Sequence, residues 1–452
     1  MESKESPKLM VSISGIRGIV GESLQSEDTL RFAMALGTKF QGGRIVVSRD
    51  SRPSGGMLRH AVIAGLLATG CTIEDIGIAS TPTCGVAVRQ LQARGGIQIT
   101  ASHNPAPWNG LKLFGPDGAV LDSATGKSVV ECFQQNRFRR VDWQHLGKVG
   151  SPPEISQAHI RLVCDTLGVS QIFSANFHVL LDANGGAGGH IGIEFLDALG
   201  CTIDQIGCDC DGYFQHEPEP VPAHLTGVAE SVRNLKPQIG FVLDPDADRL
   251  ALIDENGNCV SEEITLALAV QFRLSRIRGP VVINMSTSRM VEDLAKTYRC
   301  ECFRSAVGEA NVVAEMRRSQ AVIGGEGNGG VIDPRVGWVR DPLVGMGMIL
   351  QLMAESKKSL SQLVSELPRY EMVKTKITID QNQLPQRFSA LIEKWNSAKI
   401  DRLDGLRFDW EDRWIHIRAS NTEPVVRIIA ESPTTEETKL LCSEAESILT
   451  GS

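Results

Sequence analysis

The sequence predicts an α/β protein in which three related α/β domains with mixed or parallel sheets and a smaller C-terminal α+β domain surround a central cleft. Three observations support this prediction. The chain has 452 residues, which is too many for one hydrophobic core. It contains 44 glycines and only 5% aromatic residues, which is typical of Val/Ile/Leu/Ala-rich units joined by tight loops. Finally, one segment of the chain is repeated.

The repeated segment is GCTIEDIG, which begins at Gly70 and returns as GCTIDQIG from Gly200 with six of eight positions identical. Upstream of each copy, an apolar run that begins at Arg44 or His178 breaks into a Ser/Gly loop and is followed by a helical stretch. A third copy is expected from PVVINMSTS, residues 280–288. Each copy predicts a βαβ unit with two parallel strands and a right-handed crossover.

The pattern changes near the C-terminus, where KTKITID, a helical stretch and two or three consecutive apolar strands follow one another. This order is typical of a small α+β domain. Pro368 disfavours helix at the residue before it, which places a boundary there. We therefore expect domains at residues 1–150, 151–258, 259–368 and 369–452.

Composition excludes several classes of function. The net charge of −8 offers no general basic surface, so we expect no nucleic-acid partner. No apolar run reaches the roughly 18 residues of a membrane span, and the first residues, MESKESPKLM, lack the apolar region of a signal peptide. The 11 cysteines are typical of buried thiols in a reducing compartment. We therefore expect a cytoplasmic protein that does not bind membranes.

The first of four loops that could carry reactive residues reads TASHNP and follows an apolar strand that ends at Ile99. We call it the serine loop. Ser102 is a candidate nucleophile or phosphate carrier in this loop, with His103 and Lys112 nearby. An Asn-Pro turn with an N-capping serine is the alternative, and this loop alone favours the alternative.

The second loop, the aspartate loop, reads DPDADR between two apolar strands. The alternating carboxylates of Asp244, Asp246 and Asp248 can converge on one hard cation, and Mg²⁺ prefers such oxygen ligands. A calcium-binding EF-hand loop is excluded because Arg249 stands where glycine is required and strands flank the loop. We expect Arg249 to contact an anionic substrate beside the metal.

The third loop, the glycine-rich loop, is GEGNGG at residues 325–330. It matches the letters of a dinucleotide-binding fingerprint, but a strand follows it instead of the required helix, so that interpretation is rejected. Glu326 and Asn328 offer a carboxylate and an amide suited to hydroxyl pairs, which indicates a polyol ligand. A plain β-turn is an equally good interpretation of this loop alone.

The fourth loop, the arginine loop, is RASNTEP from Arg418, between two apolar strands. Its arginine, hydroxyls and backbone N–H groups suit a phosphate monoester, with Arg427 adding charge. A capped hairpin turn is the alternative. Near the N-terminus, Arg17 could lie over a phosphate, although a solvated loop arginine is the simpler interpretation. Thr81-Pro-Thr and the Pro-Glu-Pro at residues 218–220 are interpreted as rigid connectors.

The four loops in chain order, together with Lys112, resemble the α-D-phosphohexomutase family, and the resemblance covers nearly the whole chain. It implies that Ser102 is a phosphoserine whose phosphate holds Mg²⁺ together with the three aspartates. It further implies charge stabilisation or acid/base roles for Arg17, Lys112 and Arg249, supported by His103. The implied substrate-binding residues are Glu326, Asn328, Arg418, Ser420, Asn421, Thr422 and Arg427.

The activity implied by this resemblance is reversible phosphoryl transfer between the 6- and 1-positions of a hexose phosphate, through a hexose 1,6-bisphosphate, by a monomer or homodimer. Many family members carry GExSGH in the third loop, where this chain has Asn328 and Gly330, and a histidine where it has Glu309. The GEGNGG form favours glucosamine phosphates as substrates, with glucose and mannose phosphates as the alternative. A Mg²⁺-dependent phosphatase and a silent sugar-phosphate binding protein are remoter alternatives.

Overall fold

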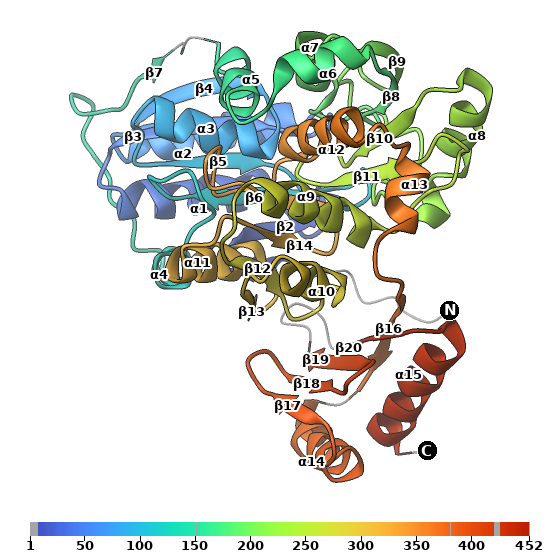
Figure 1. Cartoon of the computed structure of the whole chain (residues 1–452). Helices are drawn as coiled ribbons and strands as arrows, with labels where there is room; N and C mark the ends of the chain where they lie inside the picture. The colour runs from blue at the N-terminus through green and yellow to red at the C-terminus, as the bar shows by residue number, and fades with distance from the viewer. Residues whose placement is uncertain (1–7, 151, 153, 380, 420–424, 452) are drawn as a thin grey trace.

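The computed structural model describes residues 8–150, 152, 154–379, 381–419 and 425–451 of the chain (Figure 1). The strands form sheets of seven, four, four and five members in chain order. We call the bodies built on these sheets the first, second and third units and the C-terminal unit. Figure 1 shows the first three units packed together and the C-terminal unit, in orange and red, below them.

The first three units share one strand order, which confirms the predicted repeat. Each unit contains four strands, consecutive in the chain, that pair in the same way. The first of these four pairs in parallel with the second and with the third, and the fourth pairs antiparallel with the third. The strands are β3 (Arg44–Arg49), β4 (Thr72–Ile78), β5 (Gly95–Ile99) and β6 (Trp108–Phe114); β8 (His178–Asp182), β9 (Thr202–Ile206), β10 (Ile239–Leu243) and β11 (Leu250–Ile253); and β12 (Val281–Asn284), β13 (Cys302–Ser305), β14 (Ile323–Glu326) and β15 (Gly330–Ile332).

This common order places the three central loops at one topological position. The serine loop joins β5 to β6, the aspartate loop joins β10 to β11, and the glycine-rich loop joins β14 to β15. Each loop therefore closes the hairpin of the third and fourth strands, at the carboxyl end of a central parallel strand, where α/β sheets bind ligands. The sequence repeat lies in the other half of each unit, so it did not reveal this equivalence.

The first unit carries three further strands at the edges of its sheet, namely β1 (Met10–Ser12), β2 (Gly15–Ile19) and β7 (Val149–Gly150). Strand β2 pairs antiparallel with β6, and Arg17 stands opposite Gly110. A Cβ at Gly110 would lie 2.1 Å from the carbonyl oxygen of Ile16, so this close pairing requires glycine. Arg17 is thus a half-buried strand residue, which corrects the interpretation as a solvated loop arginine.

Helices cover both faces of these sheets. The crossover helices are α2 (Gly55–Ala68), α7 (Gly189–Ala198) and α10 (Met290–Thr297). The others in the first three units are α1 (Ser26–Lys39), α3 (Thr81–Gln90), α4 (Ser123–Gln134), α5 (Ser156–Cys164), α6 (Val169–Ala175), α8 (Thr226–Leu235), α9 (Glu262–Arg276), α11 (Glu309–Ser319), α12 (Pro342–Ser356) and α13 (Leu360–Ser365), with a 3₁₀ turn, η1 (Pro222–His224).

Two capped helix starts position polar residues of the site. The Ser80 side chain accepts a hydrogen bond from the Thr83 N–H and caps α3, with Pro82 in the first turn. The Asp341 side chain accepts from the Leu343 N–H and caps α12 in the same way. Thr81-Pro-Thr is therefore a helix start, and its interpretation as a rigid connector was wrong.

One hydrophobic core spans the second and third units, and separate cores lie in the first and C-terminal units, while a smaller cluster joins first-unit residues to Ile155 and Val339. Helix α12 of the third unit packs against α9 of its own unit and against α5 and α6 of the second. Phe195 of α7 is fully buried in the shared core. Its ring lies close to Gly347 on α12, where an added Cβ would be 3.2 Å from Phe195 Cζ. The aspartate and glycine-rich loops therefore stand on one continuous packed body.

The C-terminal unit is an antiparallel sheet of order β16-β20-β19-β18-β17, as the α+β prediction requires. Its elements are β16 (Glu371–Thr378), η2 (Gln381–Gln383), α14 (Leu384–Lys394), β17 (Lys399–Asp401), β18 (Leu406–Asp409), β19 (Trp414–Ala419), β20 (Val425–Ser432) and α15 (Thr435–Thr450). Helix α15 was not predicted. The arginine loop begins at the end of β19.

Two findings bear on the expected environment. All 11 cysteines are free thiols, and burial raises the pKa of several of them, for example Cys84 to about 12. Within the described ranges, the helices lack the combination of length and apolar character that crossing a membrane needs.

The shared core predicts that the second and third units lose stability together. Phe195→Ala should cost about 3–5 kcal/mol, because it removes a fully buried ring. Hydrogen–deuterium exchange should then quicken in both α7 and α12. Phe408→Ala, which removes a fully buried ring of the C-terminal unit, is the matched control and should quicken exchange there only. Faster exchange confined to α7 in the Phe195 variant would contradict a shared core.

Candidate active site

Side chains from the three central loops meet in one buried cluster. The Ser102 Oγ lies 3.4 Å from Asp244 Oδ2, which joins the serine loop to the aspartate loop. Lys112 Nζ on β6 lies 2.7 Å from Asp248 Oδ2. The glycine-rich loop joins the cluster through Arg340, whose guanidinium contacts both Asp248 and Glu326. The structure thus brings together most of the residues that the sequence singled out.

Ser102 is held in an unusual conformation by buried neighbours. Its φ of 52° lies in the left-handed region, which costs a non-glycine residue about 1–2 kcal/mol. Its N–H donates to Thr100 Oγ1 at 2.8 Å, and its carbonyl oxygen accepts from Arg52 Nη2 at 2.7 Å. Arg52 is itself buried and paired with Asp50, which also accepts from Thr100 Oγ1. The loop conformation is therefore fixed on both sides of the serine.

The aspartate loop folds around Asp244. Its Oδ1 accepts the backbone N–H groups of Asp248 and Arg249, each at 3.0 Å, while Ala247 adopts a φ of 50°. Thr81 of the first unit donates its hydroxyl to Asp246 Oδ2 at 2.6 Å. The three aspartates are fully buried, and one carboxylate oxygen of each lies within 4.8 Å of the others.

The donor set fits a magnesium ion. Asp246 Oδ1 and Asp248 Oδ1 are buried and lack a hydrogen-bond partner among the residues that the structure describes. Burial, together with the charges of Asp246 and Asp248, raises the pKa of Asp244 well above its ordinary value. Buried carboxylates with unpaired oxygens are costly unless a cation binds them. Carboxylate oxygens are the ligands that Mg²⁺ prefers, so these residues fit the predicted metal.

Three basic residues lie near the aspartates. Lys112 Nζ lies 3.0 Å from Asp246 Oδ2. Burial lowers the pKa of Lys112, but the charges of Asp246 and Asp248 outweigh burial and raise this pKa above its ordinary value. Arg249 Nε lies 4.0 Å from Asp244 Oδ2. Burial lowers the pKa of Arg17 despite the opposing effect of Asp246 and Asp248. These cations converge on a place where anionic groups are concentrated.

His103 lies beside the serine hydroxyl. Its Nδ1 is 3.3 Å from Ser102 Oγ, and its Nε2 is 3.8 Å from Glu219 Oε1. Burial and the nearby Arg249 and Arg17 charges lower the pKa of His103 well below its ordinary value, so the imidazole is neutral at pH 7. Glu219 also accepts from Arg249 Nη1 at 3.3 Å. The Pro-Glu-Pro segment, which the sequence predicts as a connector, therefore also contributes a contact to the candidate site.

The glycine-rich loop presents Glu326, which is buried and held from three sides. Its Oε1 accepts from Asn284 Nδ2 at 2.9 Å and from the Gly308 N–H at 3.1 Å, and its Oε2 accepts from Arg340 Nη1 at 2.7 Å. Asn328 is half-buried, and its Oδ1 accepts the Gly330 N–H at 3.2 Å. The loop is a tight turn, as the sequence predicted, and its Glu326 side chain contacts the cluster through Arg340.

The arginine loop lies only partly within the described residues. Arg418, one residue before the end of β19, stands opposite Arg427 of β20, and its Nη1 lies 3.8 Å from Asp404 Oδ2. Burial lowers the pKa of Arg418, Arg427 lowers it further, and Glu326 acts in the opposite direction. Ser420, Asn421 and Thr422 lie outside the described residues. Asp404 also accepts the Val307 N–H at 2.9 Å, which ties this unit to the third.

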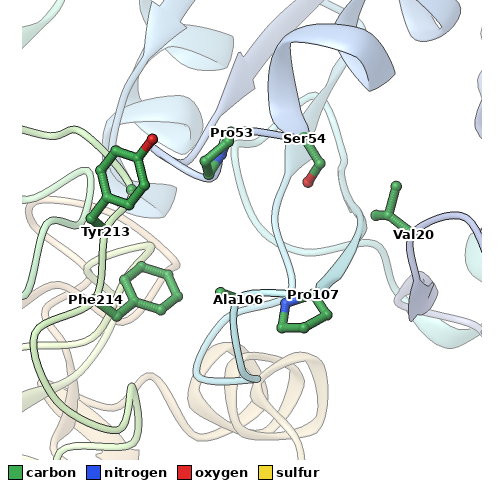
Figure 2. Close-up of a pocket in the computed structure, with 8 residues that line it drawn as sticks. Val20, Pro53, Ser54, Ala106, Pro107, Tyr213 and Phe214 are labelled. Atoms are coloured by element: carbon green, nitrogen blue, oxygen red, sulfur yellow. The ribbon is translucent and has the colours of Figure 1, made fainter.

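A cavity of about 440 Å³ flanks the serine loop (Figure 2). Tyr213 and Phe214 of the second unit form one side, facing Pro53, Ala106 and Pro107 of the first (Figure 2). Its lining contains no charged side chain, so it does not supply the charge that a phosphate requires. The charged cluster, and not this cavity, is the candidate active site.

Sequence reasoning missed several residues of the cluster. Their partners lie far away in the chain, so no local spacing marks them. In the sequence, Trp338, Arg340 and Asp341 are candidates for the mouth of the third loop's site, with core and surface positions as equally good interpretations, and Arg52 is only part of a repeated strand-loop pattern. The missed residues that contact predicted ones are Arg52, Thr81, Glu219 and Asn284, and Asp50 supports the serine loop through Arg52 and Thr100.

Removal of one aspartate should remove most of the stabilisation by magnesium. Mg²⁺ at a hundred times its dissociation constant should stabilise the protein by about 2.7 kcal/mol. Asp246→Asn should lose most of this increase in thermal midpoint, because a buried ligand charge is gone. Asp254→Asn, which changes a buried aspartate that caps its own turn in the same unit, is the control and should keep the response. Equal midpoint increases in both variants would argue against the metal site.

Glu263, which lies against Gly327 of the glycine-rich loop, should make the free energy of unfolding depend on pH. It accepts the Ser288 N–H at 2.9 Å, lies 3.4 Å from Lys374 Nζ of the C-terminal unit, and leaves room only for glycine at position 327. Burial, which outweighs the charge of Lys374, raises its pKa from 4.5 to about 7. The contribution of Glu263 to the free energy of unfolding is therefore fully present below pH 4.5 and is lost as the pH rises through 7.

Glu263→Gln should flatten this dependence, since it leaves no proton to lose. Relative to wild type, the variant should gain up to about 3 kcal/mol between pH 5 and pH 8, read from calorimetric midpoints. Glu262→Gln, which removes the other carboxylate partner of Lys374 and leaves Glu263 in place, should keep the wild-type slope. Parallel midpoint curves for Glu263→Gln and wild type would refute the assignment.

Comparison with known families shows what this arrangement belongs to. Four phosphoglucomutase/phosphomannomutase models match in order: alpha/beta/alpha domain I at residues 9–140, domain II at 157–257, domain III at 261–370 and the C-terminal domain at 373–447. Together they cover most of the chain.

Relatives and solved structures agree with the models. The chain is 36% identical to a phosphoglucomutase/phosphomannomutase of Thermococcus kodakarensis over 94% of this chain and 95% of that one. It is 34% identical to a probable phosphoglucosamine mutase of Methanosarcina barkeri over 93% and 94%. A family protein structure from Burkholderia thailandensis matches with a TM-score of 0.85 at 25% identity, covering 98% of each chain. The chain therefore belongs to the phosphoglucomutase/phosphomannomutase family within the α-D-phosphohexomutases, and it is a mutase of the isomerase class.

Proposed function

We propose that this mutase moves a phosphoryl group between the 6- and 1-positions of a hexose phosphate, through phosphorylated Ser102 and a hexose 1,6-bisphosphate. The observation that carries the proposal is the contact between the Ser102 hydroxyl and the aspartate cluster, 3.4 Å from Asp244 Oδ2. A serine held in a left-handed conformation at a cation site is suited to carry a phosphate, because its anionic form is neutralised there.

The charges around Ser102 support phosphoryl transfer. The transferring group spreads negative charge over its oxygens, so catalysis depends on positioned cations. Lys112, Arg249 and Arg17 supply these from the chain itself. Asp244, Asp246 and Asp248, with the Ser102 phosphate, would hold Mg²⁺, which supplies further neutralisation of the phosphoryl oxygens when bound.

In the first half of the proposed cycle, the bond between phosphorus and the Ser102 oxygen breaks and a bond to the free sugar hydroxyl forms. The sugar hydroxyl loses its proton, and the serine oxygen gains one. In the second half, Ser102 attacks the other phosphate of the bisphosphate, the bond between that phosphorus and the sugar oxygen breaks, and the sugar oxygen gains a proton while Ser102 must lose its own again. The neutral His103 Nδ1, 3.3 Å from the Ser102 Oγ, is placed to take this proton.

Between the two halves the bisphosphate must turn, so the site needs an anchor that accepts either phosphate. Arg418, Ser420, Asn421, Thr422 and Arg427 are the proposed anchor, on the C-terminal unit. Glu326 and Asn328 are proposed to bind the sugar hydroxyls, because both stand in the tight loop at the charged cluster. Closure of the C-terminal unit would exclude water, which would otherwise hydrolyse the phosphoserine.

Glucosamine 6-phosphate and glucosamine 1-phosphate are the proposed substrate pair, with glucose and mannose phosphates as the alternative. Support comes from the GEGNGG form of the third loop and from several relatives that are named probable phosphoglucosamine mutases. A relative at 36% identity bears the name phosphoglucomutase/phosphomannomutase, which supports the alternative. A monomer or homodimer in the cytoplasm remains the prediction for assembly and location.

Ser102→Ala should abolish interconversion of the sugar phosphates, because no residue would carry the phosphoryl group. Wild type with Mg²⁺ and a trace of hexose 1,6-bisphosphate should interconvert 1- and 6-phosphates, and its intact mass should show about 80 Da of added phosphate. Comparing kcat/KM for the 1-phosphates of glucosamine, glucose and mannose in one assay decides the sugar.

Ser54→Ala is the matched control for the serine change, since Ser54 lines the uncharged cavity and bonds only Asn109 among the described side chains. It should keep wild-type turnover and the added mass. An active Ser102→Ala protein would remove the proposed role of that serine. Stoichiometric release of free phosphate from the sugar phosphates, without interconversion, would instead identify a phosphatase.

A further inference from the structure

Arg340 joins the sugar loop to the metal loop. It precedes α12 and is 7% exposed, so its guanidinium is inside the cluster. Its Nη1 donates to Glu326 Oε2 at 2.7 Å, and its Nη2 donates to Asp248 Oδ2 at 2.6 Å. One planar fork therefore holds the carboxylate that faces the sugar and a carboxylate that faces the metal.

The bond to Asp248 also decides which of its oxygens stays free. Arg340 and Lys112 both donate to Oδ2, at 2.6 and 2.7 Å. Oδ1 is the oxygen that is buried without a partner among the described residues. Two cations thus turn Asp248 so that its unpaired oxygen remains available to a metal ion.

Arg340 is itself fixed by its surroundings. Its backbone N–H donates to Glu309 Oε1 at 2.8 Å, and its Nε lies 3.7 Å from Glu309 Oε2. The next residue, Asp341, caps α12 and accepts from His159 Nε2 at 2.7 Å. Burial raises the pKa of Glu309, and the Arg340 charge opposes this effect. The side chain therefore enters the cluster from a rigid base.

Space for Arg340 depends on Gly330. A Cβ at position 330 would lie 2.2 Å from Arg340 Cδ, so no other residue fits there without moving the arginine. Gly330 and Glu309 are two of the positions at which the sequence departs from the pattern of the family that it resembles. In the structure, one of them makes room for Arg340 and the other holds it.

We propose that Arg340 is a positioning residue that fixes the sugar-binding Glu326 relative to the metal-binding Asp248, and that Gly330 and Glu309 serve to place it. This inference rests on the proposed function for its effect on turnover, and on the metal site alone for its effect on Mg²⁺. A lysine at 340 keeps the charge but has one point of attachment, so it cannot hold both carboxylates in this geometry.

The test uses three single variants of the full chain, Arg340→Lys, Gly330→Ala and Arg340→Ala, and one double variant. Arg340→Lys should lower kcat about 100-fold while Ser102 still acquires phosphate, since misplacement of the sugar by about 1 Å costs this much. It should also weaken Mg²⁺ binding about tenfold by titration calorimetry, because Asp248 loses an orienting partner. Gly330→Ala, which leaves Arg340 intact but displaces it, should reproduce both effects.

The double variant separates displacement from any independent effect of the alanine. In an Arg340→Ala background, Gly330→Ala has nothing left to displace, so the double variant should match Arg340→Ala within about twofold. Additive losses would overturn the pairing of the two positions. Arg318→Lys, at an exposed arginine, and Gly227→Ala, where a Cβ meets nothing within 4 Å, are the controls and should match wild type.

The outcomes distinguish this inference from the proposed function. If wild type interconverts hexose phosphates and both Arg340→Lys and Gly330→Ala match it, the inference is overturned and the function stands. If wild type interconverts none, the function is overturned, and the Mg²⁺ titration decides the inference: unchanged affinity in Arg340→Lys refutes it, and tenfold weaker binding supports it. If Arg340→Lys does not fold, turnover and Mg²⁺ affinity of Gly330→Ala decide the inference in its place.

Discussion

The burial of three carboxylates in one short loop is the constraint on which the rest of the site depends. Asp244, Asp246 and Asp248 are fully buried, and a buried carboxylate without a partner costs several kcal/mol. Their neutralisation comes from elsewhere in the chain, through Lys112 of the first unit and Arg340 of the third, and from a cation that the free oxygens fit. The packing of the three units against one another is therefore also an electrostatic requirement.

The pieces of local structure were predictable because their causes are local. Apolar β-branched runs ending in glycine-rich or polar loops specified the βαβ units, and the spacing of Asp244, Asp246 and Asp248 specified a cation site. The prediction of a loop around Arg17 was wrong because the residues next to Arg17 suit a loop or a strand equally. They form a strand because they pair with β6, where Gly110 stands opposite Arg17 more than 90 residues further along the chain. Tertiary pairing decided between the two.

The supporting residues were not predictable for a related reason. Thr81 bonds Asp246 across 165 positions of the chain, and Arg340 bonds Asp248 across 92. Glu219 stands in a proline-flanked segment whose sequence indicates stiffness and nothing of its neighbours. Such contacts follow from how the units pack, so only the structure shows them. The roles proposed for the site residues remain predictions, and of the arginine loop the structure describes only Arg418 and Ala419.

The three loops that close equivalent hairpins give the site an evolutionary interpretation. The proposed serine carrier, the proposed metal ligands and the proposed sugar ligand all stand at the turn between the third and fourth strands of copies of one unit. Duplication of a single ancestral gene segment would supply three such turns already facing one another, and each could then diverge without disturbing the strands beneath it. Division of labour among copies, and not invention of a new scaffold, is sufficient to account for a site with three chemistries.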